Sequence, residues 1–224
     1  MSLPGDFDKH AATYEQVHAQ NVRPSGEDPS YFARYKLRIL ERLLGRGFAQ
    51  PVLDFGCGVG TLTALLISSF PRVDGYDPSA ESLKLARLRA PSARFLDRMD
   101  AIPDSHYGAV ILANVLHHVP AGQRAGLLRK LAAALSPNGS LIVFEHNRLN
   151  PITRRVVSAC PFDDGAQLLF PGEVKRLLRG AGLAAVSLDH IVFFPRPLRL
   201  LRALEPWLRW LPLGAQVYAW GRKQ

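Results

Sequence analysis

The feature that most constrains the fold is a group of glycines directly after a short apolar segment. Residues 52–63 read VLDFGCGVGTLT, so a strand expected at 51–55 runs into Gly56, Gly58 and Gly60 and then into a helix expected at 61–70. Glycines at such a turn allow positive φ angles and let a ligand approach the backbone closely. This order predicts the first unit of an α/β sheet with a ligand at its turn.

The segments that follow continue to alternate between strand and helix. Further strands are predicted at 72–76, 93–96, 108–113 and 140–145, and helices at 79–90 and 122–135. A looser pattern adds a helix at 171–182 and strands at 184–194 and 215–220. We therefore expect βαβ units that form a mostly parallel sheet with helices on both faces.

Length and composition agree with a single domain over residues 1–224. The chain is 47% hydrophobic and 21% charged and contains no repeat, low-complexity tract or linker. No apolar run approaches the ~20 residues of a membrane span, and the opening MSLPGDFDKH lacks the layout of a secretory signal. Two cysteines, Cys57 and Cys160, are too few for a disulfide framework, so we expect a cytoplasmic protein.

The chemistry of the turn separates several classes of ligand. The spacing is G-x-G-x-G with Thr61 next, which differs from the G-x-G-x-x-G pattern of dinucleotide sites. Asp54, two residues before the first glycine, would repel a pyrophosphate but suits a cationic ligand. The Lys-Ser/Thr pair of a P-loop is missing, which argues against a nucleoside triphosphatase.

Two further carboxylates follow predicted strands. Asp77 ends the strand at 72–76, lies 21 residues after Gly56 and could accept hydrogen bonds from both hydroxyls of a ribose. Asp100 follows the strand at 93–96 and could accept a hydrogen bond from an adenine amino group. Either aspartate could instead cap the helix that follows its strand.

Five stretches resemble, in order, the motifs of class I S-adenosylmethionine (SAM)-dependent methyltransferases: VLDFGCGVGTLT, VDGYDPS, DRMDAIP, NVLHHVP and LSPNGSLIVFEHN. The similarity is strongest to the small-molecule enzymes of the ubiquinone/menaquinone-biosynthesis type (methyltransferase type 11/12). It covers most of residues 6–185. It implies a Rossmann-like α/β fold with a seven-stranded, mostly parallel sheet whose last strand is antiparallel.

The resemblance implies SAM as cofactor and S-adenosylhomocysteine as product. The opening FDKHAATYEQ resembles the N-terminal helix of this subgroup, so residues 1–47 would form a helical lid that contains Tyr14. The residues that would contact the cofactor are Tyr14, Asp54, Gly56, Cys57, Gly58, Gly60, Asp77, Pro78, Asp100, Ala101 and Asn114. Cys57 is also explained simply as a small residue in a crowded turn.

Methyl transfer from a sulfonium is an in-line displacement, and alignment of the reactants supplies much of its catalysis. A base is needed only when the acceptor must lose a proton. Ligands of open α/β sheets bind beyond the carboxyl ends of the strands, and three histidines lie there. His118, slightly preferred, His117 and His146 are the candidate bases, although each could instead bond a loop, cap a turn or face solvent.

Residues 146–170 and 196–212 are expected to form substrate caps. Glu145, Asn147, Arg154 and Arg155 are candidate substrate-binding residues, and the two arginines could grip a phosphate or carboxylate or be merely solvated. The segment resembles a bacterial branch with an E-H-N…N-P…T-R…C-P-F-D signature, associated with surface saccharides and lipid-linked intermediates. No metal site is expected, because neither C-x-x-C nor H-x-x-x-H spacing occurs.

Positive charge is concentrated in the C-terminal part of the chain. From Arg148 onward there are 12 Lys+Arg against 5 Asp+Glu, compared with 16 against 14 before it. This suggests an anionic substrate, an anionic membrane surface, or a solvated face without a partner. Residues 198–211 predict an amphipathic helix with Leu and Trp opposite Arg, kinked or restarted at Pro206. The region 197–211 could lie on a membrane, cover a sheet edge or form a dimer contact.

These features predict a methyltransferase that acts on a small acceptor. O-methylation of a saccharide, lipid-linked or polyketide-like hydroxyl is the first expectation. C-methylation of a quinone-like ring and a non-catalytic SAM-binding partner subunit are the alternatives. Residues 114–117 read Asn-Val-Leu-His and lack the Asn/Asp-Pro-Pro-aromatic turn of enzymes that methylate nucleobase or glutamine nitrogens, and no nucleic-acid partner is expected.

Overall fold

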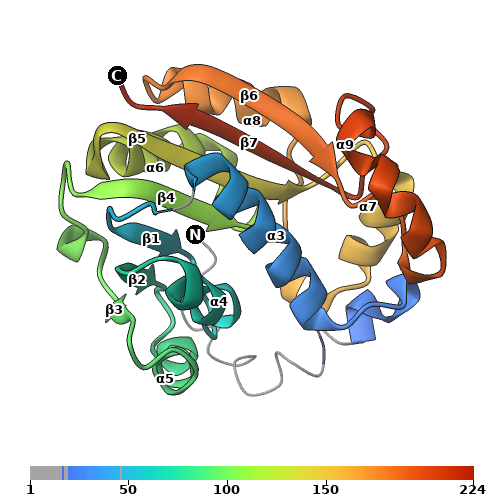
Figure 1. Cartoon of the computed structure of the whole chain (residues 1–224), viewed down its shortest axis with the longest axis horizontal. Helices are drawn as coiled ribbons and strands as arrows, with labels where there is room; N and C mark the ends of the chain where they lie inside the picture. The colour runs from blue at the N-terminus through green and yellow to red at the C-terminus, as the bar shows by residue number, and fades with distance from the viewer. Residues whose placement is uncertain (1–16, 18–19, 46) are drawn as a thin grey trace.

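A computed structural model describes residues 17, 20–45 and 47–224, and its centre is one seven-stranded sheet (Figure 1). The strand order is β3-β2-β1-β4-β5-β7-β6. The strands are β1 (Val52–Phe55), β2 (Val73–Tyr76), β3 (Arg94–Leu96), β4 (Tyr107–Ala113), β5 (Leu135–His146), β6 (Ala184–Ile191) and β7 (Gln216–Arg222). β7 lies between β5 and β6 and is antiparallel to both, while the remaining pairs are parallel. The expected fold class is confirmed.

Helices cover both faces of the sheet. They are α3 (Pro29–Leu44), α4 (Thr61–Ser69), α5 (Ala80–Arg89), α6 (Ala121–Ala134), α7 (Pro151–Ser158), α8 (Pro171–Gly180) and α9 (Glu205–Leu208). Leu40 of α3 and Leu66 of α4 belong to one buried cluster, and Leu131 of α6 and Leu178 of α8 belong to the other. β4 contributes to both clusters, because its side chains alternate between the two faces of the sheet.

Local sequence explains where several elements begin. The side chain of Ser79 accepts a hydrogen bond from the backbone N–H of Ser82 and caps α5. Asp28 caps α3 in the same way, and Asn150 caps α7 by accepting from two backbone N–H groups. β4 is buried over almost its whole length, in keeping with its continuous apolar sequence.

Two elements differ from expectation. β5 begins at Leu135 rather than at 140, because Leu135 pairs with Tyr107 before the register with β4 shifts between Tyr107 and Ala109. Residues 198–211 do not form one α-helix: a 3₁₀ helix, η6 (Arg196–Leu204), is followed by the short α9. Pro206 lies in the first turn of α9, which agrees with the expected restart of the helix.

The parallel arrangement brings the carboxyl ends of β1, β2, β4 and β5 to one edge of the sheet. The glycine turn, Asp77, the histidine pair and Glu145 all follow or end these strands. Among the described residues, no helix is both long enough and apolar enough to cross a membrane.

Candidate functional site

The turn after β1 has the backbone geometry expected of its glycines. Gly56, Gly58 and Gly60 have φ angles of 76°, 52° and 78°, in the left-handed region that disfavours residues with a Cβ. A Cβ on Gly56 would come within 2.6 Å of a methyl group of Val115, whereas a Cβ on Gly58 would have nothing within 4 Å. The turn is therefore tightly packed at Gly56 and open at Gly58, where a ligand can approach the backbone.

Asp77 is fixed beside this turn. One of its carboxylate oxygens accepts a hydrogen bond from the backbone N–H of Gly58 at 2.8 Å, and the other accepts from that of Ser79 at 2.9 Å. Because Ser79 rather than Asp77 caps α5, simple helix capping does not account for the position of Asp77. A carboxylate can accept several hydrogen bonds, and the binding of two ribose hydroxyls by Asp77 remains a prediction.

Asp54 and Asn114 form the deeper part of the same site. Asp54 is buried and accepts a hydrogen bond from the Thr63 hydroxyl at 2.7 Å, and burial raises the pKa of its carboxyl to about 6. Asn114 has an unusual φ of 59°, and its buried Oδ1 has no hydrogen-bond partner among the described residues. An orphaned amide oxygen needs a hydrogen-bond donor, and a buried carboxylate is stabilised by a nearby cation. The ammonium of SAM supplies both, so these residues fit the expected cofactor.

The remaining expected cofactor contacts are less defined. Asp100 is exposed in a 3₁₀ turn, η3 (Met99–Ala101), with Ala101 also exposed, and its carboxylate pairs with Arg98. Contact of either residue with adenine remains a prediction, as does contact with Pro78. The Cys57 thiol lies in the crowded turn, where a Cβ on Gly75 would come within 3.0 Å of its sulfur. Tyr14 lies outside the described residues.

Glu145 links β5 to the loop after β4. Its Oε1 accepts hydrogen bonds from the backbone N–H groups of Val115 at 3.1 Å and Leu116 at 2.7 Å. Its Oε2 lies 2.6 Å from Nδ1 of His117, and the whole side chain is buried. These three groups engage its carboxylate and the side chain has no exposed surface, so Glu145 holds His117 in place in this structure, and its contact with substrate remains a prediction.

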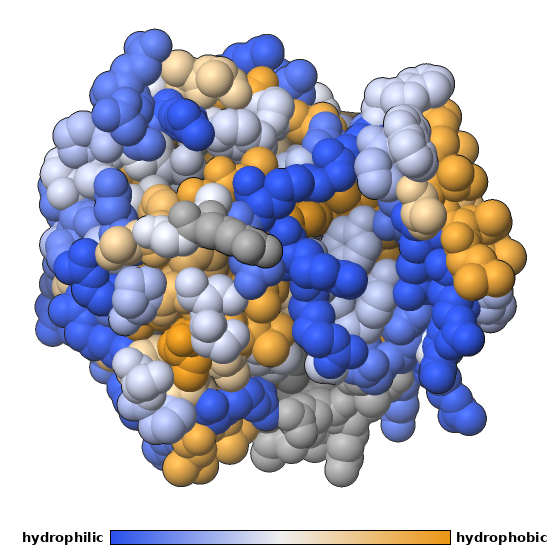
Figure 2. Space-filling view, in the orientation of Figure 1, coloured by the Kyte–Doolittle hydropathy of each residue, from blue (hydrophilic) through white to orange (hydrophobic). Residues whose placement is uncertain are grey.

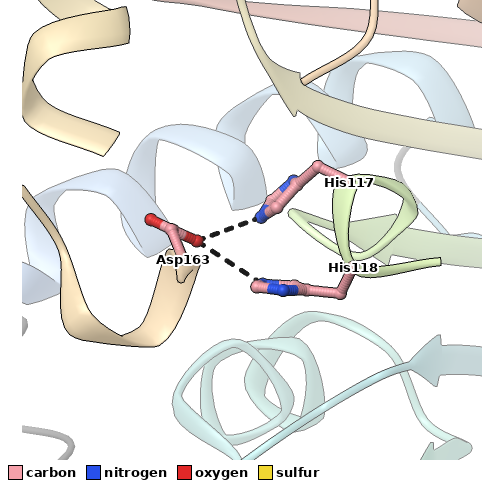
Figure 3. A group of neighbouring side chains, drawn as sticks. All are labelled: His117, His118 and Asp163. Carbon is pink, nitrogen blue, oxygen red and sulfur yellow. Dashed lines mark ion pairs between the residues drawn. The ribbon is translucent and has the colours of Figure 1, made fainter. Parts of the chain in front are cut away.

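Asp163 completes the cluster, and its place in the site was not predicted from the sequence. It ends the 3₁₀ helix η5 (Pro161–Asp163), and its Oδ1 lies 3.3 Å from Nε2 of His117 and 3.5 Å from Nε2 of His118. Figure 3 shows both imidazoles turned toward this carboxylate. The C-P-F-D signature was the signal that could have found it.

The three histidines differ in charge. Burial opposes protonation of His117, but the carboxylates of Glu145 and Asp163 overcome this effect and raise its pKa to about 9. Burial and the neighbouring His117 charge lower the pKa values of His118 and His146 to about 4. At neutral pH the cluster therefore contains one imidazolium and two neutral imidazoles, with the ring centroids of His117 and His146 5.3 Å apart.

A buried lysine contributes a second positive charge. Lys36 projects from α3, and burial lowers its pKa to about 8 while the charges of Glu145 and Asp54 oppose that shift. Lys36 and His117 thus offset the buried carboxylates. Nothing in the sequence of α3 distinguished Lys36 from its other basic residues.

His117, His118 and Asp163 could also hold a metal ion, since their ligand atoms lie within 4.8 Å of one another. A metal ion at Nε2 of His117 would have to displace the proton that the raised pKa retains there. The electrostatics of the cluster therefore favour the imidazolium over a metal ligand.

The other expected substrate residues are separated from this cluster. Asn147 is buried, and its amide donates to the carbonyls of Pro212 and Gly214 at 3.0 and 2.8 Å. These bonds fasten the end of β5 to the loop before β7, and contact of Asn147 with substrate remains a prediction. Arg154 and Arg155 are exposed on α7, and their binding of an anionic acceptor remains a prediction.

Comparison with known proteins supports the same class of site. Residues 27–197 match the family model described as "Methyltransferase domain". The chain is 33% identical over 205 residues to trans-aconitate 2-methyltransferase of Variovorax paradoxus, covering 81% of this chain and 78% of that protein. It is 28% identical to ubiquinone biosynthesis O-methyltransferase of Idiomarina loihiensis, covering 66% and 67%. The solved complex of DhpI with SAH covers 98% of this chain and 94% of its own, with a TM-score of 0.66 and 20% identity, and so supports the fold.

Proposed function

Because the chain belongs to the SAM-dependent methyltransferases, with SAM as cofactor, we propose that it transfers the methyl group to a hydroxyl oxygen of a small acceptor. The observation that carries this proposal is the position of His118 and His146 at the carboxyl ends of β4 and β5, with Asp163 3.5 Å from Nε2 of His118. A hydroxyl must lose its proton as the new C–O bond forms, and a neutral imidazole can accept that proton. The O-methyltransferase named among the relatives supports an oxygen acceptor.

The cofactor side of the site is assigned to the residues beside the glycine turn. Bound SAM supplies an electrophilic methyl group on a sulfonium. Asp54 and the orphaned Oδ1 of Asn114 would hold its ammonium, and Asp77 would accept hydrogen bonds from its ribose hydroxyls. Asp100 and Ala101 would flank the adenine.

We assign the base to His118. Its imidazole is neutral, and Asp163, 3.5 Å from its Nε2, would stabilise the positive charge that appears when it takes the proton. His117 cannot accept a proton at neutral pH, because its raised pKa keeps it protonated. It is therefore a positioning residue, held by Glu145. His146 is the rival base.

The acceptor side favours a polar molecule. His118 and Asp163 are only partly buried and present polar atoms beside the buried His117, so they can contact a polar acceptor. A saccharide, lipid-linked or polyketide-like hydroxyl would fit this chemistry, and an anionic group on the acceptor could bind Arg154 and Arg155. A quinone-like ring methylated at carbon is the alternative acceptor.

The test is turnover with methyl-labelled SAM against a panel of acceptors: hydroxylated saccharides, polyprenyl-linked saccharides, polyketides, quinols and trans-aconitate. We expect a labelled methyl ether together with stoichiometric S-adenosylhomocysteine. Label found at a ring carbon would show that the enzyme methylates carbon rather than a hydroxyl oxygen. Binding of SAM without turnover on any acceptor would support a non-catalytic partner subunit instead.

A further inference from the structure

One edge of the molecule is covered by apolar side chains that contact little else. In η6, α9 and the following loop, the exposed large apolar residues are Leu198, Leu200, Leu201, Leu204, Trp207, Trp210 and Leu213. We call this set the apolar face. Leu200 is 87% exposed and Trp210 75%. Figure 2 shows hydrophobic side chains gathered at the right edge with hydrophilic side chains beside them, where Figure 1 draws α9 and the orange-red segment around it.

The polarity of this segment is inverted relative to an ordinary surface helix, whose apolar side faces the core. Its buried residue is Glu205, whose carboxylate accepts a hydrogen bond from the Tyr35 hydroxyl at 2.5 Å and from the backbone N–H of Phe193 at 3.0 Å. Arg202 also points inward, over the ring of Tyr31 at 4.6 Å and onto Glu27. Charged groups hold the segment to α3, and its apolar groups face solvent.

The 3₁₀ geometry aligns the exposed leucines. A 3₁₀ helix has three residues per turn, so side chains three apart lie above one another. Leu201 and Leu204 follow this spacing in η6, after a kink at Leu198, whose φ and ψ angles are not helical. The loop beyond α9 is fastened by Asn150, whose amide donates to the Leu213 carbonyl at 2.7 Å. The apolar face is therefore a fixed surface.

The exposed charges of the segment that carries the apolar face are positive. Between residues 193 and 215 the single acidic residue, Glu205, is buried, while Arg196 and Arg199 are exposed. The adjoining α7 adds Arg154 and Arg155 with no acidic residue, together with the exposed Ile152. Leucine and tryptophan beside arginine suit the boundary between the headgroups and acyl chains of an anionic bilayer.

From this combination we propose that the apolar face docks on an anionic lipid bilayer, with leucines and tryptophans in the interface and arginines on the headgroups. A second copy of the chain fits less well. A two-fold interface places the same patch on both subunits and would bring the like-charged arginines of η6 and α7 close to one another. Docking at a membrane would also present a lipid-linked acceptor to the site. That consequence rests on the proposed hydroxyl methylation, whereas docking itself does not.

The test is flotation of the full chain with vesicles of phosphatidylcholine alone and of phosphatidylcholine with 30 mol% phosphatidylglycerol. We expect binding to the anionic vesicles, a blue shift of tryptophan emission, and weakening by salt. Leu200→Ser/Trp207→Ser and Arg196→Glu/Arg199→Glu should each reduce binding by about ten-fold or more. The matched control is Leu88→Ser/Arg129→Glu, whose exposed positions lie on α5 and α6, and it should bind like the native chain.

Circular dichroism and thermal melting show whether each variant is folded, and sedimentation without lipid reports the oligomeric state. Absence of vesicle binding by the native chain would overturn the proposal. A native dimer that Leu200→Ser/Trp207→Ser dissociates, without vesicle binding, would assign the face to a second copy. Equal binding of the control and the two test variants would also overturn it. None of these results depends on methyl transfer, so they are separable from failure of the proposed function.

Discussion

Nδ1 of His117 lies 2.6 Å from Oε2 of Glu145, and both side chains are almost completely shielded from solvent. The raised pKa of His117 makes this contact a pH-dependent source of stability. Since the folded pKa of about 9 exceeds the ordinary value of 6.5, the stabilisation is complete below pH 6.5 and is lost as the pH rises through 9. We predict that the free energy of unfolding falls by up to about 3 kcal/mol between pH 6.5 and 9.5.

Urea unfolding across this pH range measures the effect. Glu145→Gln removes the charge that holds the proton, so its stability should be lower at pH 6.5 and should change less up to pH 9.5. Glu81→Gln, an exposed substitution on α5, serves as the control and should keep the native pH dependence. An unchanged slope in Glu145→Gln would contradict the assigned pairing.

His118→Gln should abolish most of the turnover while SAM still binds. Loss of a general base costs about 10²–10⁴-fold in rate, so kcat should fall by that amount with little change in the Kd for SAM. His146→Gln should have the smaller effect if His118 is the base. The comparison is made by rapid-quench assay on the acceptor that the panel identifies. A larger loss in His146→Gln would transfer the role of base to His146.

The pH profile gives an independent check of the base. Since His118 has a lowered pKa of about 4, it remains able to accept a proton down to that pH. The rate should therefore fall only as the pH drops toward 4, within the range in which the protein stays folded. A fall centred near pH 6.5 would indicate a base with an ordinary histidine pKa.

Removal of divalent cations should leave the protein unchanged. Because His117 holds its proton between two carboxylates, we expect no stoichiometric metal in the purified chain and no change in melting temperature or turnover after dialysis against EDTA. Inductively coupled plasma mass spectrometry measures the metal content. One bound ion per chain that disappears in Asp163→Asn would assign His117, His118 and Asp163 as its ligands.

Gly56→Ala should damage both the fold and the cofactor site. The new Cβ would overlap Val115 and force apart the glycine turn and the loop after β4. The φ angle of 76° adds about 1–2 kcal/mol of backbone strain for a residue with a Cβ. A loss of 2–4 kcal/mol in unfolding free energy is expected. Gly122→Ala, in α6 with open space around its Cβ, is the matched control and should be neutral or slightly stabilising.

The cofactor half of the site was predictable because its chemistry is local. The strand, the three glycines and Asp54 lie within a few residues of one another, and each has a conformational or electrostatic reason to be there. The sheet class followed from the alternation of elements. Position in the sequence alone could not show that β7 inserts between β5 and β6, because that order depends on long-range pairing.

The acceptor half was predictable only as a list of polar residues. His117, Glu145 and Asp163 come from three separate segments, and only the fold shows that they form one buried network. Glu145 and Asn147 were expected at the substrate because they end a strand, but both are used internally. In 198–211 the periodicity suggested an α-helix, whereas the backbone adopts 3₁₀ geometry after Pro197, with Leu198 outside helical φ/ψ.

The most direct measurement of the central claim is calorimetric titration of SAM and S-adenosylhomocysteine into the native chain and Asp77→Ala. We predict micromolar binding by the native chain, roughly −8 kcal/mol, and loss of about a hundred-fold or more in Asp77→Ala. Asp104→Ala, an exposed substitution, should bind like the native chain. Equal affinity in the native chain and Asp77→Ala, or no binding of either ligand to the native chain, would contradict the assignment of this site to SAM.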